Sequence, residues 1–361
     1  MAWYVLAGRN VGFRIGRWAS NFYQNVPVIR DVLQGLQPGA VPTGVTLLTP
    51  QCYLNEVGLD IDAGITPIVA IGVENIASLE EFIVRAQNIR TRFTVQSTNG
   101  TSHPISFIHN LIEGATRLGG LYHLPPYFLD FYVVDTAVGT PGILGGYRVC
   151  APFAFVRNLR WTQRPDDAAQ VEITWFVPYV SFDTFSGSIT LVQYLVDAGI
   201  FIAREGVLQV TASGSDVIDL TALSQDRIVT DLTIELNNDL REVYTFSLAG
   251  DITTEAIRRL LRVFNAIFEG RSTVSGSFTM IYPALLGSLN LAQPQAFKTL
   301  TFTYYEAAGS GYSQNPVPVY KVEIVDAKVL SARVNFATEQ MVSLSCNFQG
   351  LDFNAQLLIS S

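Results

Sequence analysis

The stretch Val342-Ser-Leu-Ser-Cys-Asn-Phe-Gln-Gly350 decides the fold class, because apolar and polar side chains alternate along it without a break. Successive side chains of a strand point to opposite faces. One face is therefore apolar and the other polar: Val342, Leu344, Cys346 and Phe348 against Ser343, Ser345, Asn347 and Gln349. The pattern predicts a long antiparallel strand with one buried face and one wet, uncharged face.

Most of the chain follows the same two-residue rhythm, and three segments depart from it. Residues 104–118 and 254–269 carry apolar side chains at helical spacing and end at glycine, and residues 79–88 follow a capping-box pattern. We expect helices there and strands elsewhere. The fold class predicted is therefore α+β, mainly β.

The order of elements is repeated along the chain. Residues 92–118 match 242–268 at an offset of 150, and residues 128–182 match 299–353 at an offset of 171. We therefore predict two tandem domains at 41–187 and 188–361, each an antiparallel β-sandwich or partial barrel with one flanking helix, after an N-terminal arm at 1–40. Two unrelated α+β domains of similar rhythm are the alternative. The arm either wraps a neighbouring chain or contains a packed strand.

The composition points to a surface that other molecules cover. Charged residues are 15% of the 361 residues, against about a quarter in typical soluble domains. We expect that cover to be further copies of the same chain. The net charge of −8, without a Lys/Arg-rich stretch, argues against a surface that grips nucleic acid. Three widely spaced cysteines indicate a reducing compartment rather than a disulfide framework. We expect no signal peptide and no membrane helix.

The sequence offers little catalytic or metal-binding chemistry. His109 and Glu113 have the i, i+4 spacing of a shared metal, but no third ligand is positioned. Ser102 precedes His103 and is better explained as a helix cap than as a nucleophile. We therefore predict a protein that is not an enzyme and that has no cofactor and no metal.

Two segments carry a resemblance to a known family. The strand pattern Val-x-Leu-x-Cys-x-Phe-x-Gly-Leu-x-Phe at 342–353, with an apparent copy at 171–182, resembles the final strand of phage tail tube proteins and their relatives in contractile injection systems. The copy departs by carrying Pro178, which cannot donate to a ladder, so pairing there should be broken or at an edge. A doubled chain is similar to the tube subunits suspected in very long-tailed siphophages of thermophilic hosts.

The resemblance implies a structural virion protein that self-assembles. Six such domains form a ring in this family, so a doubled chain implies trimeric, pseudo-hexameric rings that stack into a tail tube. Implied partners are the chain itself, a tape-measure protein, tail terminator and initiator or baseplate proteins, and double-stranded DNA that passes without sequence-specific binding. No membrane partner is expected. The protein would be found in the virion, as part of the phage tail assembled in the host cytoplasm.

Two sets of residues are candidates for functional surfaces. Strands that close into a large barrel leave a channel, and a mostly neutral or acidic wall with few Lys or Arg would let DNA pass. The channel-lining candidates are Glu172, Thr174, Ser343, Ser345, Asn347 and Gln349. The long loops at 136–146 and 306–318 expose apolar residues, which suggests inter-subunit contacts through Val138, Ile143, Leu144 and Tyr312.

Two other functions remain open from the sequence. One is a baseplate hub or tail tube initiator, which caps a tube and does not polymerise alone. The other is a two-domain β-rich receptor- or carbohydrate-binding module, for which Tyr304, Tyr305 and Tyr312 are the nearest aromatic candidates. Tyr304 and Tyr305 should point to opposite faces of one strand.

Overall fold

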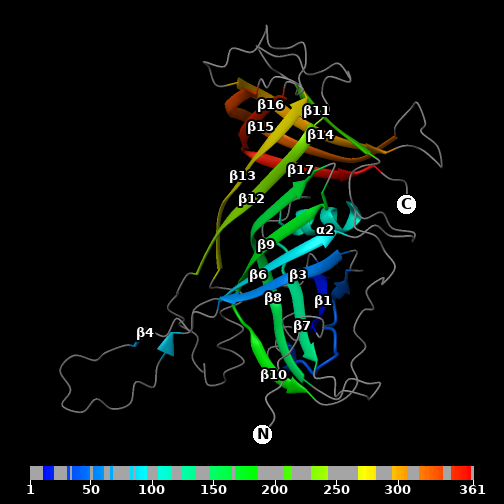
Figure 1. Cartoon of the computed structure of the whole chain (residues 1–361). Helices are drawn as coiled ribbons and strands as arrows, with labels where there is room; N and C mark the ends of the chain where they lie inside the picture. The colour runs from blue at the N-terminus through cyan, green and yellow to red at the C-terminus, as the bar shows by residue number, and fades with distance from the viewer. Residues whose placement is uncertain are drawn as a thin grey trace, which may run out of the picture.

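A computed structural model describes most of the strands that the alternation predicts. The residues described are 11–19, 31–32, 35–48, 52–60, 66–67, 82–83, 87–95, 105–115, 124–134, 146–164, 167–185, 206–213, 229–242, 267–281, 295–306, 317–335 and 343–358. The fold is mainly β with one helix, and the strand pairings are antiparallel, so the predicted fold class is confirmed (Figure 1).

Within the described residues, the N-terminal half contributes the helix α2 and ten strands. They are β1 (Val11–Trp18), β2 (Val45–Leu47), β3 (Cys52–Asp60), β4 (Thr66–Pro67), β5 (Phe82–Ile83), β6 (Gln87–Val95), α2 (Ile105–Ala115), β7 (Tyr127–Val134), β8 (Gly146–Gln163), β9 (Gln170–Val177) and β10 (Ser181–Phe185). β1 pairs with β2 and β7, β7 with β8, β8 with β9 and β10, β9 with β6, and β6 with β3. β4 and β5 form a small separate sheet.

The C-terminal half repeats this pairing with seven strands. They are β11 (Gly206–Ser213), β12 (Val229–Glu242), β13 (Ile267–Ile281), β14 (Gln295–Glu306), β15 (Val317–Asn335), β16 (Ser343–Gly350) and β17 (Asp352–Leu357). β11 pairs with β14, β14 with β15, β15 with β16 and β17, β16 with β13, and β13 with β12. Each strand thus has a counterpart in the first half, in the same order of pairing. The predicted domain boundaries stay predictions.

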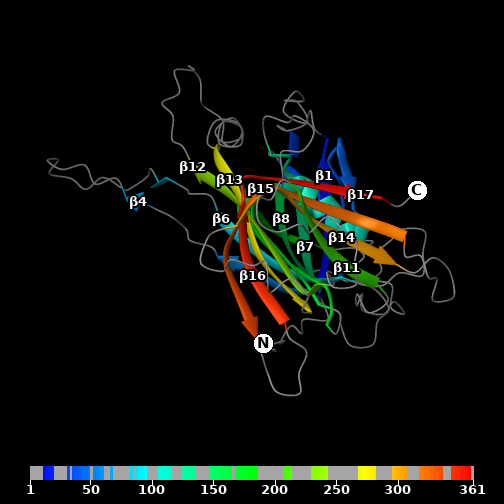
Figure 2. The same cartoon turned by 90° about the horizontal axis from the view of Figure 1, so that it is seen from above.

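The two halves are joined by backbone pairing. Residues 232–237 of β12 pair with residues 158–163 of β8, which makes one 15-stranded sheet. In Figure 1 the blue and green strands of the first half lie below the yellow to red strands of the second, and Figure 2 shows the same strands from above. One hydrophobic core cluster contains buried side chains from both halves.

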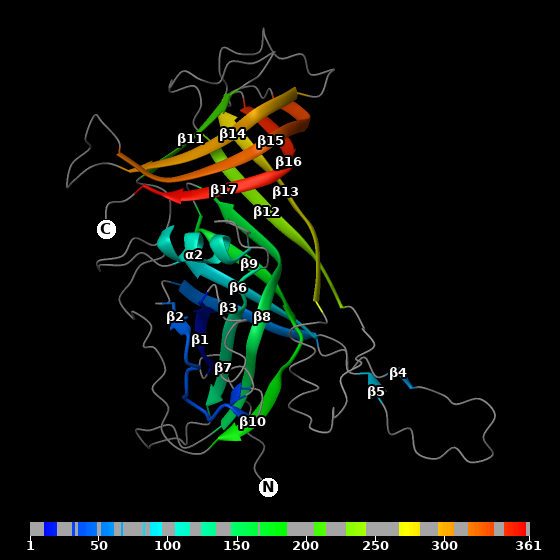
Figure 3. The same ribbon diagram turned by 180° about the vertical axis from the view of Figure 1, so that it is seen from behind.

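α2 lies where the halves meet. Figure 3 shows it next to β17, and it also contacts β8. The predicted helical stripe is confirmed, since the side chains expected on it are buried: Ile105, Ile108, Leu111, Ile112 and Ala115. Gly114 allows the helix to approach β7, because a Cβ there would come within 1.9 Å of the Tyr127 hydroxyl. That hydroxyl donates a hydrogen bond to the Asn110 carbonyl at 2.5 Å.

Two helix predictions need correction. Residues 82–83 and 87–88 of the predicted helix at 79–88 are in strands, because backbone pairing with β4 and β9 there overrides a local capping pattern. The predicted helix at 254–269 ends too late, since β13 begins at Ile267, and residues 254–266 lie outside the described residues. The match at an offset of 150 is also wrong: it aligned β6 with the end of β12, whereas the pairing makes β13 the counterpart of β6.

The motif at 342–353 is two strands rather than one. β16 confirms the alternation, with Leu344, Cys346 and Phe348 buried. The chain then bends at Leu351, and β16 and β17 pair with successive parts of β15. The first copy bends likewise after β9, where pairing stops at Pro178 as predicted.

The segment predicted as an arm includes a packed strand. β1 pairs with β7 along residues 11–17, and Phe13 and Ile15 are buried in the core. Of the two alternatives for the arm, the packed strand is therefore the one that the structure shows for residues 11–18.

Candidate assembly surface

One face of the sheet is polar across both halves, and we call it the polar face. Its side chains alternate with buried ones on β6, β9, β8, β12, β13 and β16, and register pairs such as Arg160 with Glu235 place the two halves on the same face. The six channel-lining candidates all lie on it: Glu172 and Thr174 on β9, and Ser343, Ser345, Asn347 and Gln349 on β16. Their role in lining a channel stays a prediction.

The polar face carries more charge in the first half than the sequence suggested. Directly opposed residues on β6, β9, β8 and β12 alternate in sign: Arg92, Glu172, Arg160 and Glu235. The Arg92 Nε lies 2.9 Å from the Glu172 Oε1. The row continues on β13 and β16 with neutral Ser275 and Gln349.

Two arginines of this face, Arg92 and Arg164, form ion pairs with carboxylates. Arg164 Nε lies 2.8 Å from Asp231 Oδ1 across the β8–β12 junction, and Asn158 donates a hydrogen bond to Glu235 at 3.0 Å. Half-exposed ion pairs of this kind contribute at most about 1 kcal/mol each to stability. Their larger effect is on the electrostatic field of the polar face. That face is rich in charges of both signs rather than uncharged, which corrects the expectation of few arginines.

Within the described residues, one edge of β8 pairs along most of its length with strands of the same chain, whereas the equivalent edge of β15 has a stretch without a partner. β8 is flanked on one edge by β7 and then, from Asn158 onward, by β12. β15 is flanked by β14 only as far as Val329. Since β14 and β16 both pair with residues 328–329, they lie on opposite edges of β15. Within the described residues, nothing pairs with residues 330–335 on the β14 edge.

Side-chain burial follows this difference. Leu159 and Trp161, on the buried face of β8 beside β12, are 0% and 1% exposed. Ala332 and Val334 occupy the matching part of β15 and are only partly buried. The bulged residue Leu330 is 58% exposed. Among the described residues, no strand lies beside this part of β15, whereas β12 lies beside the matching part of β8.

At the other end of the wall, β3 has an open edge as well. In the part of the chain that the structure describes, β3 pairs with β6 alone. Its counterpart β12 pairs with both β13 and β8. An eight-stranded wall, β3-β6-β9-β8-β12-β13-β16-β15, thus ends in one unpaired strand edge on each side. Unpaired edges readily add strands from other chains.

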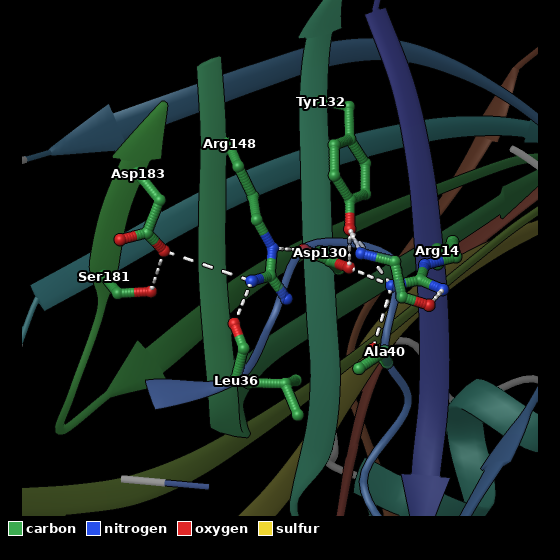
Figure 4. Close-up of polar contacts among 9 residues, drawn as sticks. Arg14, Leu36, Ala40, Asp130, Tyr132, Arg148, Ser181 and Asp183 are labelled. Carbon is green, nitrogen blue, oxygen red and sulfur yellow. Dashed lines mark hydrogen bonds and ion pairs between the residues drawn. The ribbon is translucent and has the colours of Figure 1, made fainter. Parts of the chain in front are cut away.

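A second polar site is buried away from the polar face. Arg14 on β1, Asp130 and Tyr132 on β7, and Arg148 on β8 converge in the first half (Figure 4). Asp130 is fully buried and pairs with both guanidinium groups, that of Arg148 at 2.7 Å. The Tyr132 hydroxyl donates to Asp130 at 2.5 Å.

This buried network holds the preceding loop against the sheet. Arg14 donates to the carbonyls of Gly39 and Ala40, at 2.9 and 3.1 Å, and Arg148 donates to the Leu36 carbonyl at 2.5 Å. Burial raises the pKa of the Tyr132 hydroxyl to about 12, and Asp130 adds to that shift. The hydroxyl therefore stays protonated as a donor. The guanidinium groups of Arg14 and Arg148, held by the Asp130 carboxylate, thus anchor residues 36–40 against the sheet.

One feature of the sequence indicates this network, although the two-residue periodicity does not. Asp130 is the one acidic residue of Tyr127-Phe-Leu-Asp-Phe-Tyr-Val-Val134, a strand that is apolar on both sides of it. A charge in such a run must be buried with a partner. The position of the partner arginines on β1 and β8 could not be read from the sequence.

His109 and Glu113, the candidate metal ligands, lie beside other side chains rather than beside a third ligand. His109 Nε2 is 3.8 Å from Glu113 Oε1, and Arg17 donates to the other oxygen of Glu113 at 2.5 Å. The imidazole also contacts the Tyr320 ring, with centroids 5.7 Å apart. Burial lowers the pKa of His109, with Glu113 acting in the opposite direction and Arg17 in the same one. Among the described residues, no group of three or more His, Cys, Asp or Glu side chains could hold a metal ion.

Several further expectations can be placed. Tyr304 is buried and Tyr305 half-buried on the opposite face, so they do not form an exposed aromatic cluster. Cys150 and Cys346 are free and buried, and burial raises the pKa of both thiols. The loop candidates Val138, Ile143, Leu144 and Tyr312 lie outside the described residues, as do Ser102 and His103. Among the residues that the structure describes, no helix is long and apolar enough to cross a membrane.

Comparisons with known proteins give weak structural neighbours. No family model matches the chain, and no curated protein matches it. Among solved structures, an Hcp protein has 10% sequence identity and a TM-score of 0.22, covering 42% of this chain and 97% of its own. A mutant form of Hcp1 from the E. coli EAEC 042 pathovar has 11% identity and a TM-score of 0.19, covering 42% and 98%. A likeness this weak does not establish a shared fold.

Proposed function

We propose that this protein is the structural subunit of a phage tail tube. Three chains form a ring of six similar domains, and the rings stack around a channel through which DNA passes. The single observation that carries the proposal is the repeated wall. The edge of β8 is closed by β12 within the chain, whereas no described strand pairs with the equivalent edge of β15 or the outer edge of β3.

An open wall of this kind favours closure with copies of itself. Within one chain, β8 of the first half pairs with β12 of the second half. Repeating that relation between chains joins β15 of one copy to β3 of another, and a head-to-tail contact produces a ring when its rotation closes. Three copies of an eight-stranded wall give a barrel of about two dozen strands, wide enough to leave an open channel. Closure pairs the two strand edges at which the eight-stranded wall ends.

The polar face suits the inner wall of such a channel. On β13 and β16 it is mostly Ser, Thr, Asn and Gln, and at the junction of the halves Glu172 on β9 and Glu235 on β12 stand directly opposite Arg160. A wall whose arginines are balanced by carboxylates releases few counterions when DNA enters, so it should hold a duplex weakly. Weak holding permits rapid passage.

The remaining parts of the proposal follow from a tube role. The protein would act without catalysis and without a cofactor. Its partners would be a tape-measure protein in the channel and terminator and initiator or baseplate proteins at the tube ends. It would be assembled in the host cytoplasm and found in the virion. The loops with Val138, Ile143, Leu144 and Tyr312 are the proposed contacts between rings.

Electron microscopy of the purified chain at rising concentration, with mass measurement, tests the proposal. Hollow filaments built from three-chain rings support it. Isolated three-chain rings that never stack would favour the baseplate hub or initiator instead. Compact monomers at all concentrations would contradict self-assembly and favour the binding module. Deleting residues 138–145 tests the loops: tubes of normal length after the deletion would contradict their assigned role.

A further inference from the structure

We infer the register of the contact between two copies: residues 333–335 of β15 pair antiparallel with residues 58–60 of β3 in a second copy, with Arg333 opposite Asp60. The inference rests on the proposed function, and it adds which residues meet. It is derived from the junction that the chain closes by itself, β8 with β12.

The first step aligns β15 with β8. Each strand has a β-bulge in its pairing with β9 or β16, at Arg157 in β8 and at Leu330 in β15. The bulge makes the alignment unambiguous, because it interrupts the two-residue alternation. Arg160 and Trp161 then correspond to Arg333 and Val334. The faces agree: Arg160 and Arg333 are exposed on the polar face, and Trp161 and Val334 point toward the core.

The second step aligns β3 with β12 through the strands between them. Thr174 on β9 and Asn347 on β16 hold the same position directly after the bulges. Following the register across β6 from Thr174 leads through Arg90 to Gly58. Following it across β13 from Asn347 leads through Ser277 to Thr233. Gly58 is therefore the counterpart of Thr233, and Asp60 is the counterpart of Glu235.

The third step combines the two alignments. In the closed junction Arg160 pairs with Glu235, and Trp161 pairs with Ile234. The same pairing between copies places Arg333 opposite Asp60 and Val334 opposite Leu59. The side-chain types agree between the β8–β12 junction and the inferred β15–β3 junction. At both, one pair joins a cation with a carboxylate and the next pair joins two apolar residues. The alignment used only backbone register and bulges, so this agreement in side-chain type is independent support.

A disulfide between copies tests the register. Directly opposed residues in antiparallel strands bring their Cβ atoms within disulfide range, whereas residues offset by two do not. The test pair is Val334→Cys with Leu59→Cys, and the matched control is Val334→Cys with Val57→Cys, both in a chain with Cys52→Ser, Cys150→Ala and Cys346→Ala. We expect the test pair to give covalent dimers and trimers on a non-reducing gel, and the control to give under a tenth of that yield.

The outcomes separate the register from the proposed function. Three-chain rings in the microscope without cross-links, or with cross-links only in the control pair, would overturn the register and leave the tube role standing. Absence of both rings and cross-links in the unmodified chain and its variants would overturn both.

Charge reversal gives a second test without new cysteines. Arg333→Asp or Asp60→Arg alone should weaken ring formation roughly tenfold per junction, because like charges directly opposed repel. The double variant should restore assembly to near the starting level. The matched control Lys328→Asp lies on the same strand but beside β14 and should leave assembly unchanged. Failure of the double variant to rescue would overturn the pairing of Arg333 with Asp60.

Discussion

The two halves share one order of strand pairing but differ in what covers the same edge. β8 meets β12 of its own chain, and its side chains Leu159 and Trp161 are fully buried. β15 has no such neighbour among the described strands, and Ala332 and Val334 remain partly exposed. Among the described residues, the chain therefore closes one of two equivalent junctions by itself, and the other is where we propose that a second copy pairs.

The halves differ again at the opposite end of these strands. In the first half the buried Arg14, Asp130 and Arg148 anchor the loop at 36–40. By register, the counterparts of Asp130 and Arg148 are Thr301 and Lys321, and Lys321 forms a half-exposed pair with Glu323. Among the described residues, the buried ionic anchor of the first half therefore has no equivalent at Thr301 and Lys321.

The largest expected effect tests this anchor. Asp130→Asn leaves Arg14 and Arg148 buried without their counter-charge, which should lower the free energy of unfolding by about 3–5 kcal/mol. The matched change in the second half, Thr301→Val, should alter it by less than about 1 kcal/mol. Urea unfolding curves of both variants measure the difference. Equal losses would contradict the asymmetry between the halves.

A smaller effect tests the closed and open junctions. Leu159→Ala removes a buried side chain beside β12 and should cost about 2–4 kcal/mol in the isolated chain. Val334→Ala lies on the open edge and should cost under about 1 kcal/mol there, and more once rings form. Thermal unfolding at low and high protein concentration makes the comparison. A Val334→Ala loss that is large and independent of concentration would mean that this edge is covered within one chain.

Gly276 offers a test of close packing in the second half. A Cβ at this position would come 2.2 Å from the Thr233 carbonyl oxygen and 2.6 Å from the Phe348 ring. Gly276→Ala should therefore destabilise the chain by about 1–3 kcal/mol, since the obstacle includes backbone. Its counterpart by register in the first half is Ile89, for which Ile89→Val should cost about 1 kcal/mol. Chemical denaturation compares the two, and a neutral Gly276→Ala would show that β12 and β13 are less tightly packed than described.

The smallest effect concerns pH at the meeting of the halves. Burial holds the pKa of His109 below 6.5, and the imidazole lies among Glu113, Arg17 and Tyr320. The unfolded chain therefore binds the proton more readily, so this group's contribution to stability is lost as pH falls from 6.5 through the lower folded value. His109→Gln should flatten the pH dependence of the unfolding free energy in that window. An unchanged slope would assign it to other groups.

Much of the wall could be predicted from the sequence. The alternation at 343–350 gave β16 with its buried Leu344, Cys346 and Phe348, and the stripe at 105–115 gave α2. Side-chain periodicity determines these elements because each must bury one face. The short pattern at 79–88 failed because a capping signal without a long apolar stripe is too weak to overrule strand pairing.

The sequence by itself determined that this is a mainly β chain whose pattern occurs twice, because two-residue alternation and its order are written in the side chains. Only the tertiary structure decided which strands are neighbours: that β13 rather than β12 matches β6, that β12 closes the edge of β8, and that Asp130 lies between two arginines. The physical reason is that strand pairing uses backbone groups common to all residues, so its partners are selected by packing across the whole sheet.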